Sequence, residues 1–281
     1  GQMGTVFSQQ WEGSELSGRY ELVEVGRREL DLIDPLKVKK YLADLRPTYI
    51  LNTAAYTRVD EAESDQESAY RVNEKAVGLL ADWCKGNSCR LLHISTDFVF
   101  DGEANSPYSE ESFTGPKSIY GASKLAGEEV ILQSSLSALV IRTSWLYSPF
   151  GHNFCKTMLR LGSERSELSV VNDQIGTPTS ALDLARAVFQ IIEKGLPSSS
   201  EILHVSNSGQ CSWADFAREI FTQKSLSTTV NNTTTEAFNA PAPRPKYSVL
   251  STEKLLFTYG IAMRPWKEAL EEVLKIGRAH V

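Results

Sequence analysis

The chain has 281 residues, a formal net charge of −6 and a hydrophobic content of 41%. This is the composition of an ordinary globular protein with one large or two small cores. The acidic balance argues against a nucleic-acid-binding surface, and no apolar run approaches the roughly 20 residues that a membrane-spanning helix needs. The four cysteines form no CxxC pair, which favours free thiols in a reducing cytoplasm. The four histidines form no pattern such as HExxH, so we expect no catalytic metal.

Short apolar runs alternate with helical patterns through the first half of the chain. Four of these runs are predicted to be buried strands: Tyr20–Val25, Tyr49–Asn52, Arg90–Ser95 and Ala138–Arg142. Asp34-Pro35 is typical of a helix start, with an N-cap followed by proline at the first helical position. A longer amphipathic helix is expected from about Glu67 to Lys85. Strands that alternate with helices predict βαβ units and a parallel sheet.

The second half of the chain is less regular. Ser180–Asp183 and Ser212–Asp215 resemble capping boxes, with Asp in place of the usual Glu, and predict the starts of two amphipathic helices. Ile202–Val205 is predicted to be a strand, and Asn231–Pro245, rich in Asn, Thr, Ala and Pro, is predicted to be a loop. We expect a dinucleotide-binding domain over residues 1–150 and a substrate domain over 151–275, with 180–205 returning to the first domain.

Both ends of the chain depart from the patterns beside them. Gly1 leads directly into a helical pattern, whereas a dinucleotide-binding turn follows a strand and an earlier glycine. We therefore expect that the first strand of a doubly wound, Rossmann-like sheet is missing from this chain. At the other end, residues 276–281 do not continue the amphipathic helix predicted over Trp266–Lys275, and we expect them to be a non-native tail.

The segment Tyr120-Gly-Ala-Ser-Lys124 places a tyrosine and a lysine one turn apart on the same face of a predicted helix. An ammonium beside a phenol favours the phenolate, so we expect a lowered tyrosine pKa. A tyrosine tuned in this way can donate a proton to a carbonyl oxygen while hydride reaches the carbon. The spacing alone is weak evidence, because an ordinary surface pair has it too.

Two further segments point to the same chemistry. Ser95-Thr96-Asp97 stands at the carboxyl end of a predicted strand, where open parallel sheets bind ligands, and a hydroxyl there can hydrogen-bond the same carbonyl oxygen. The alternative is a turn that uses these side chains for local backbone bonds. Gly1-Gln-Met-Gly4 is half of a fingerprint whose glycines let the backbone approach a pyrophosphate at a helix N-terminus. In this order, the three segments predict a dinucleotide-dependent reductase.

The chain resembles the extended short-chain dehydrogenases and, within them, the dTDP-4-dehydrorhamnose reductase family. The resemblance covers nearly the whole chain. Besides the segments above, it rests on Asn52–Asp60 (NTAAYTRVD), Arg142–Tyr147 (RTSWLY) and Asn172–Pro178 (NDQIGTP). It implies a doubly wound α/β domain with a smaller C-terminal α/β substrate domain. It also implies NADPH-dependent reduction of dTDP-4-dehydro-L-rhamnose to dTDP-L-rhamnose.

The resemblance further implies a role for individual residues. Tyr120 is expected to donate the proton, Lys124 to hold the nicotinamide ribose, and Thr96 to bind the reacting carbonyl oxygen. Other cofactor contacts are implied at Gly1, Gln2, Met3, Gly4, Asp31, Leu32, Ala54, Ala55 and Tyr56. Contacts to the sugar nucleotide are implied at Thr96, Asp97, Trp145, Asn153 and Arg244. Core packing is the alternative for Trp145, and a solvated loop is the alternative for Arg244.

Arg27 and Arg28 follow the first predicted strand, at a place where an NAD-selective site often has an acidic residue. Arginine there can accommodate a 2′-phosphate, which favours NADPH over NADH as the cofactor. NADH stays open, and the alternative for the two arginines is that they are solvated loop charges.

Two other functions also stay open. Another nucleotide-sugar reductase or epimerase of the same fold would share the catalytic residues. The regulatory subunit of methionine adenosyltransferase resembles the same family but acts as a binding partner. The Thr57–Asp60, Arg142–Trp145 and Asn172–Gln174 segments favour the reductase. As its partner we expect a dTDP-linked 4-keto sugar, with no nucleic acid and no membrane, and a homodimer is left open.

Overall fold

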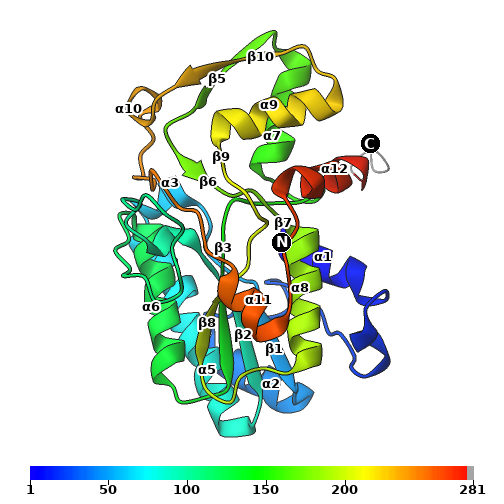
Figure 1. Ribbon diagram of the computed structural model, residues 1–281. Coiled ribbons are helices and arrows are strands. Elements are labelled where there is room, and N and C mark those ends of the chain that lie inside the picture. Colours follow the sequence, from blue (N-terminus) through cyan, green and yellow to red (C-terminus); the bar gives the residue numbers. More distant parts are fainter. Residues whose placement is uncertain (277–281) are drawn as a thin grey trace.

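Four parallel strands form the central sheet of the computed structural model, which describes residues 1–276 (Figure 1). The strand order is β1 (Tyr49–Asn52), β2 (Arg90–Thr96), β3 (Ala138–Thr143) and β8 (Glu201–His204). The register places Thr96 opposite Thr143 at the carboxyl ends of β2 and β3. Parallel strands need crossover connections, and here these connections are helices. The α/β fold class with a parallel sheet, predicted from the alternation of strands and helices, is confirmed.

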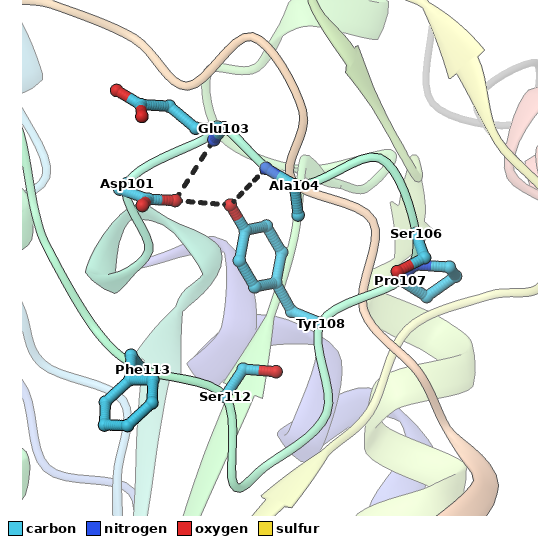
Figure 2. A pocket seen from close by; sticks show the side chains of 8 residues that line it. All are labelled: Asp101, Glu103, Ala104, Ser106, Pro107, Tyr108, Ser112 and Phe113. Atoms are coloured by element: carbon cyan, nitrogen blue, oxygen red, sulfur yellow. Dashed lines mark hydrogen bonds between the residues drawn. The ribbon is translucent and has the colours of Figure 1, made fainter.

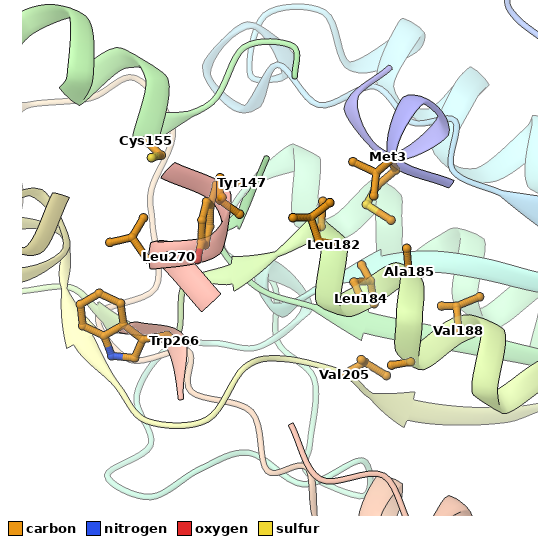
Figure 3. Packing of buried hydrophobic residues seen from close by; sticks show 14 of the residues in the cluster. Met3, Tyr147, Cys155, Leu182, Leu184, Ala185, Val188, Val205, Trp266 and Leu270 are labelled. Carbon is orange, nitrogen blue, oxygen red and sulfur yellow. The ribbon is translucent and has the colours of Figure 1, made fainter. Parts of the chain in front are cut away.

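Neighbouring residues of the central strands enter two separate cores, because successive side chains of a strand point to opposite faces. Leu91 and Val140 belong to the core that includes α2 (Pro35–Leu45), α5 (Ala76–Asn87) and α6 (Ile119–Gln133). Leu92 and Ile141 belong to the larger core, which includes α1 (Gln2–Trp11) and α8 (Ala181–Lys194) and part of which Figure 3 shows. Helices therefore cover both faces of the sheet.

The segment Tyr20–Val25 is not a strand, although its apolar pattern predicts one. A strand depends on backbone hydrogen bonds to a neighbour, and among the described residues this segment has no such neighbour. Its Val23 and Val25 side chains are exposed. The ring of Tyr20 packs edge-on against that of Tyr49, with 5.5 Å between the ring centroids. In the described part of the chain, β1 is therefore an edge strand.

A second lobe lies beyond the carboxyl ends of the central strands (Figure 1). It consists of α7 (Phe154–Glu164), the parallel pair β5 (Glu167–Val171) and β10 (Thr229–Thr233), the antiparallel pair β6 (Ile175–Gly176) and β9 (Cys211–Ser212), α9 (Trp213–Lys224) and α12 (Trp266–Ile276). The predicted capping box of Ser212 and Asp215 begins α9. Ser180 caps α8 without such a box, because Asp183 instead binds the guanidinium groups of Arg186 and Arg264.

Residues 180–205 lie against the central sheet. Helix α8 belongs to the larger core together with α1, and β8 pairs with β3. The prediction of a loop over Asn231–Pro245 is wrong in its first part, since Thr229–Thr233 forms β10 and Thr235–Phe238 forms α10. Pairing with β5, which lies far away in the sequence, offsets the low strand propensity of the asparagines. Helix α12 extends to Ile276, and the remainder of the predicted tail lies outside the described residues.

The remaining elements are short and connect the larger ones. They are β4 (Leu146–Tyr147), β7 (Thr179–Ser180), α3 (Val59–Ala62), α4 (Gln66–Tyr70), α11 (Glu253–Tyr259), the 3₁₀ helices η1 (Glu15–Gly18) and η3 (Asp97–Val99), and the π-helix η2 (Arg71–Lys75). The predicted helix from Glu67 to Lys85 is thus α4, η2 and α5 joined end to end. Among residues 1–276, no helix has both the length and the apolar character that crossing a bilayer requires.

Candidate active site

The predicted catalytic residues lie where β2 ends and α6 begins. Helix α6 starts after its N-cap Ser118, whose hydroxyl accepts a hydrogen bond from the Gly121 amide at 3.1 Å. Gly121 lets the helix approach the end of β2, because a Cβ at this position would lie 2.2 Å from the carbonyl oxygen of Phe98. The close approach sets the ring of Tyr120 beside that of Phe98, with 5.5 Å between the centroids.

Thr96 and Asp97 form the turn at the carboxyl end of β2. The Thr96 hydroxyl accepts a hydrogen bond from the Phe98 amide at 3.2 Å and donates one to the Asp97 carboxylate at 3.0 Å. The predicted alternative of local turn bonds is therefore present, and the same side chain is also near enough to Tyr120 to lower the pKa of its phenol. The structure thus brings Thr96, Asp97 and Tyr120 together. Burial raises the pKa of the Asp97 carboxyl to about 6, and the nearby Ser248 and Thr96 hydroxyls oppose this rise.

The expectation of a lowered Tyr120 pKa is wrong for this structure. Burial raises the pKa of the Tyr120 phenol to about 12, the Asp97 charge adds to the rise, and the Thr96 hydrogen bond opposes it. The phenol therefore keeps its proton at neutral pH, which is the form that a proton donor needs.

Lys124 is enclosed, with 1% of its surface exposed. Its terminal nitrogen donates to the carbonyl oxygen of Ile94 at 2.7 Å and lies 3.1 Å from Nε2 of His93. Burial lowers the pKa of Lys124 to about 8, and the Glu128 charge opposes this shift. The helical spacing places Lys124 on the same helix face as Tyr120, but these hydrogen bonds direct its terminal nitrogen to β2.

A buried ion pair holds α6 against β3. Glu128 and Arg142 are 0% and 2% exposed, and two guanidinium nitrogens reach the same carboxylate oxygen at 3.0 and 2.6 Å. The Ser95 hydroxyl donates to the other carboxylate oxygen. No role was predicted for these three residues, although Ser95 and Arg142 lie within segments on which the reductase prediction rests.

Asn73, in the π-helix η2, fixes the loop after β1. Its fully buried side chain accepts from the Tyr56 amide at 2.8 Å and donates to the Tyr56 carbonyl at 3.1 Å and to the Ser123 hydroxyl at 2.9 Å. A Cβ at Gly127 of α6 would lie 2.0 Å from the Asn73 carbonyl oxygen. The loop that contains Ala54, Ala55 and Tyr56 is thus tied to α6 by a π-helical residue, a feature that often marks functional sites. Sequence periodicity does not reveal it.

Helix α1 begins without a capping side chain, because its N-cap is Gly1. Free amide groups at a helix N-terminus favour anions such as a pyrophosphate. The Gln2 side chain is already bonded to Ser148 and Asn153. The Met3 side chain lies in the larger core (Figure 3), so only the backbone of Met3 is available for the predicted cofactor contact.

The four other predicted cofactor residues lie on the surface after Tyr20–Val25. Arg27 and Arg28 are exposed, and Nε of Arg27 is 3.8 Å from a carboxylate oxygen of Asp31. Leu32 packs at the edge of the smaller core. Because Arg27 and Arg28 are exposed, their guanidinium groups are accessible to a ligand.

Trp145 combines packing with an unusual backbone. Its ring stacks on Trp213, with 3.6 Å between centroids and 6° between planes, and a Cβ at Gly176 would lie 2.4 Å from it. Its φ of 45° is in the left-handed region, which is uncommon for a residue with a Cβ. The side chain stays half-buried, so the predicted alternative of core packing is realised in part.

Asn153 and Arg244, predicted to contact the sugar nucleotide, both have protein partners. The Asn153 carboxamide caps α7 by accepting from the Lys156 amide at 3.1 Å. The Arg244 guanidinium makes two hydrogen bonds to the Asp60 carboxylate, at 3.0 and 2.9 Å, which lower the pKa of that carboxyl. Asp60, at the start of α3, thus holds the Arg244 side chain beside the loop that follows β1. The sequence analysis quoted Asp60 within a motif but assigned it no role.

Figure 2 shows an open depression beside Tyr108, whose lining includes Asp101 and Phe113. The Tyr108 hydroxyl donates to Asp101 at 2.6 Å and accepts from the Ala104 amide at 3.1 Å. Lys117 neutralises Glu103 at its rim. None of the predicted catalytic residues lines this depression, so the candidate active site stays at the carboxyl ends of β1, β2 and β3.

The fold and this geometry define a class of protein. A doubly wound sheet that carries a threonine at the end of one strand, and a tyrosine and lysine on the following helix, is the arrangement expected of an extended short-chain dehydrogenase. The chain belongs to the family described as RmlD substrate binding domain, whose sequence profile matches residues 1–278. The predicted family is confirmed.

Individual relatives agree with this assignment. The chain is 41% identical over 262 residues to a dTDP-4-dehydrorhamnose reductase of Sinorhizobium fredii. The aligned residues cover 90% of this chain and 88% of that protein. It is 39% identical over 254 residues to a probable dTDP-4,6-dihydroxy-2-methyloxan-3-one 4-ketoreductase of Streptomyces antibioticus, covering 90% and 85%. The crystal structure of a Bacillus anthracis dTDP-4-dehydrorhamnose reductase in complex with NADP matches with a TM-score of 0.93 at 38% identity, covering 98% and 96%.

Proposed function

We propose that this chain catalyses the NADPH-dependent reduction of the C4 keto group of dTDP-4-dehydro-L-rhamnose to give dTDP-L-rhamnose. The observation that carries the proposal is the meeting of Thr96, Tyr120 and Asp97 at the carboxyl end of β2, with Lys124 enclosed against the same strand. The family membership and the reductases among the relatives support the same reaction.

The residues present fit a dinucleotide cofactor. The amide groups at the start of α1 have no capping side chain, which suits a pyrophosphate. Arg27 and Arg28 are exposed cations that suit a 2′-phosphate and favour NADPH, with NADH a weaker alternative. Ala54 is exposed at the end of β1, where Asn73 fixes the loop, and suits a neighbouring part of the cofactor. NADP in a relative of 38% identity supports this choice.

The chain's own residues handle the oxygen of the carbonyl group, while NADPH supplies the hydride. The Tyr120 phenol, protonated at neutral pH, donates its proton to the carbonyl oxygen as the carbon is reduced. The Thr96 hydroxyl orients that oxygen by a hydrogen bond, which positions the substrate. Asp97 and Trp145 contact the sugar, and Asn153 and Arg244 lie on its nucleotide side. Lys124 holds the nicotinamide ribose.

The test is NADPH oxidation by the purified protein with a panel of 4-keto sugars linked to dTDP, GDP or UDP. We expect turnover with dTDP-4-dehydro-L-rhamnose and formation of dTDP-L-rhamnose. Turnover of a GDP- or UDP-linked sugar, with the dTDP sugar inert, would reject the substrate assignment. Binding of the dTDP sugar without turnover of any panel member would favour a regulatory, non-catalytic function.

A second candidate differs only in the sugar. The Streptomyces relative, 39% identical, is named for the reduction of a different dTDP-linked 4-ketone. The panel therefore includes a dTDP-4-keto sugar with a deoxygenated or methylated ring, and a higher kcat/KM for that sugar would select this candidate.

We place the reaction in the cytoplasm and leave a homodimer open. Cys84, Cys89, Cys155 and Cys211 are all buried free thiols, which is the usual state in a reducing compartment. Cell fractionation and light scattering test the location and the oligomeric state.

A further inference from the structure

A buried series of hydrogen-bonded side chains links the loop after β1 to Lys124. The Ala54 amide donates to Oδ1 of Asn52 at 3.1 Å, and Nδ2 of Asn52 lies 3.0 Å from Nδ1 of His93. On the far side of the ring, Nε2 of His93 lies 3.1 Å from the terminal nitrogen of Lys124. Asn52, His93 and Lys124 are 5%, 0% and 1% exposed, so water does not compete for these contacts.

The Ala54 amide fixes the orientation of the Asn52 carboxamide. A backbone N–H can only donate, so the atom facing it must be the oxygen Oδ1. The amide group of Asn52 then faces Nδ1 of His93 as a donor, and Nδ1 must accept. A neutral imidazole carries one proton, so that proton is on Nε2. A doubly protonated ring is excluded as well, because Nδ1–H would face the N–H of Asn52.

The proton on Nε2 of His93 points at Lys124. An ammonium has three donors and no acceptor, so it would oppose Nε2–H at 3.1 Å. A neutral amine has a lone pair that accepts from Nε2–H, and it still donates to the Ile94 carbonyl oxygen at 2.7 Å. Each donor along this series of hydrogen bonds therefore meets an acceptor only when Lys124 is uncharged.

We infer that His93 is a positioning residue, and that the tautomer imposed on it by Asn52 favours the neutral amine form of Lys124 in the free protein. The positioning role of His93 rests on the function proposed above, in which Lys124 holds the cofactor ribose. The tautomer itself does not depend on that function. His93 lies in a strand that the sequence analysis treated only as an apolar run.

The surrounding charges do not overturn this assignment. On α6, Glu128 favours the charged lysine, but its carboxylate is already paired with Arg142 of β3. Tyr120, also on α6, keeps its proton at neutral pH. Burial lowers the pKa of Lys124 to about 8 and lowers that of His93 well below its usual value. Both shifts are in the direction of the uncharged forms, and above a pH of about 8 the amine of Lys124 is mostly neutral, as the hydrogen-bond pattern requires.

The test is ¹⁵N NMR of the histidine ring nitrogens in the full-length, cofactor-free protein at pH 8.5. The chain has four histidines, so the His93 signal is assigned by its loss in His93→Gln. The exposed His152 supplies the matched control, because His152→Gln should leave the His93 signal in place. We expect a neutral ring with Nε2 protonated and Nδ1 not. A proton on Nδ1, or on both nitrogens, would overturn the inference.

The isosteric variant Asn52→Asp tests the direction of the coupling. A carboxylate accepts from Nδ1–H, so the ring should switch tautomer and Nε2 should accept from a charged Lys124. We expect the Lys124 pKa, followed by ¹³Cε and ¹⁵Nζ NMR of labelled lysine, to rise by about one unit. An unchanged tautomer and an unchanged lysine pKa would reject the role of Asn52. Both measurements use no substrate, so an inactive protein in the reductase panel would leave their outcome decisive.

Discussion

The two sides of the candidate active site are built differently. On the side of β2, β3 and α6, ionisable groups such as Glu128 and Lys124 are enclosed and each has a protein partner. On the side of Gly1–Leu32, Arg27 and Arg28 are exposed, and the Tyr20–Val25 segment has no sheet partner in the described residues. The enclosed side can hold a proton donor in a fixed geometry, whereas the exposed side can adapt to a ligand. Substitutions should therefore affect rate or stability strongly on the first side and only cofactor choice on the second.

The largest effect is expected at the proton donor itself. Tyr120→Phe removes the phenolic proton and keeps the ring that packs on Phe98. We expect kcat to fall by ~10²–10⁴, with the NADPH Kd nearly unchanged, because a positioned general acid contributes about this much. Steady-state kinetics and cofactor titration provide the measurement. Tyr41→Phe, on α2, is the control and should keep normal turnover. Near-normal turnover of Tyr120→Phe would remove Tyr120 from the acid role.

The next effect is on stability and comes from the buried ion pair. Glu128→Gln leaves the Arg142 charge buried without a counter-charge. We expect the free energy of unfolding to fall by about 3–5 kcal/mol, measured by urea denaturation. The neighbouring exposed Glu129 provides a matched control, since Glu129→Gln should change it by less than about 0.5 kcal/mol. Equal effects of the two variants would mean that enclosure of this side of the site contributes nothing to stability.

Asp97 gives the enclosed side a predicted pH dependence. Its carboxyl pKa is raised from 3.8 to about 6, so the folded protein binds more protons than the unfolded one between these values. The free energy of unfolding should therefore fall as the pH rises from about 4 to 6, by ~1–3 kcal/mol. Asp97→Asn should flatten this fall and be the more stable form at pH 7. Denaturation curves at pH 4.5 and 7 measure it, and identical pH dependence of the two proteins would contradict the buried-charge explanation.

How far the sequence predicts the molecule depends on which contacts define each feature. The fold class and the Tyr120–Lys124 face follow from local periodicity, which the chain carries within each element. The Tyr20–Val25 segment has the same apolar pattern but pairs with no strand among residues 1–276, and β10 has a partner in β5 despite a poor pattern. In both cases, whether the segment forms a strand depends on pairing with a segment far away in the sequence, and local periodicity carries no information on that pairing.

The same reasoning separates the parts of the site. Thr96 and Tyr120 meet because one ends a strand and the other begins the following helix, which spacing predicts. The partners of Lys124 could not be predicted, since a long side chain bonds whatever donor or acceptor the adjacent strand presents, here His93. Asp60 belongs to the Asn52–Asp60 motif. Its bond to Arg244 could not be predicted, because the two residues are far apart in the sequence.

The smallest effect is expected on the exposed side, at Arg27 and Arg28. The only ion pair described for Arg27 among residues 1–276 is long and exposed, at 3.8 Å from Asp31, so the arginines contribute little to stability. Replacing both with alanine should weaken NADPH binding on the order of tenfold, because a charge-assisted contact to a phosphate is lost. NADH binding should change little, since NADH has no 2′-phosphate. The control removes another adjacent exposed pair of cations, Lys39 and Lys40 on α2, and should affect neither cofactor. Fluorescence titration with both cofactors measures the ratio, and an equal loss for NADPH and NADH would show that the arginines do not bind the 2′-phosphate.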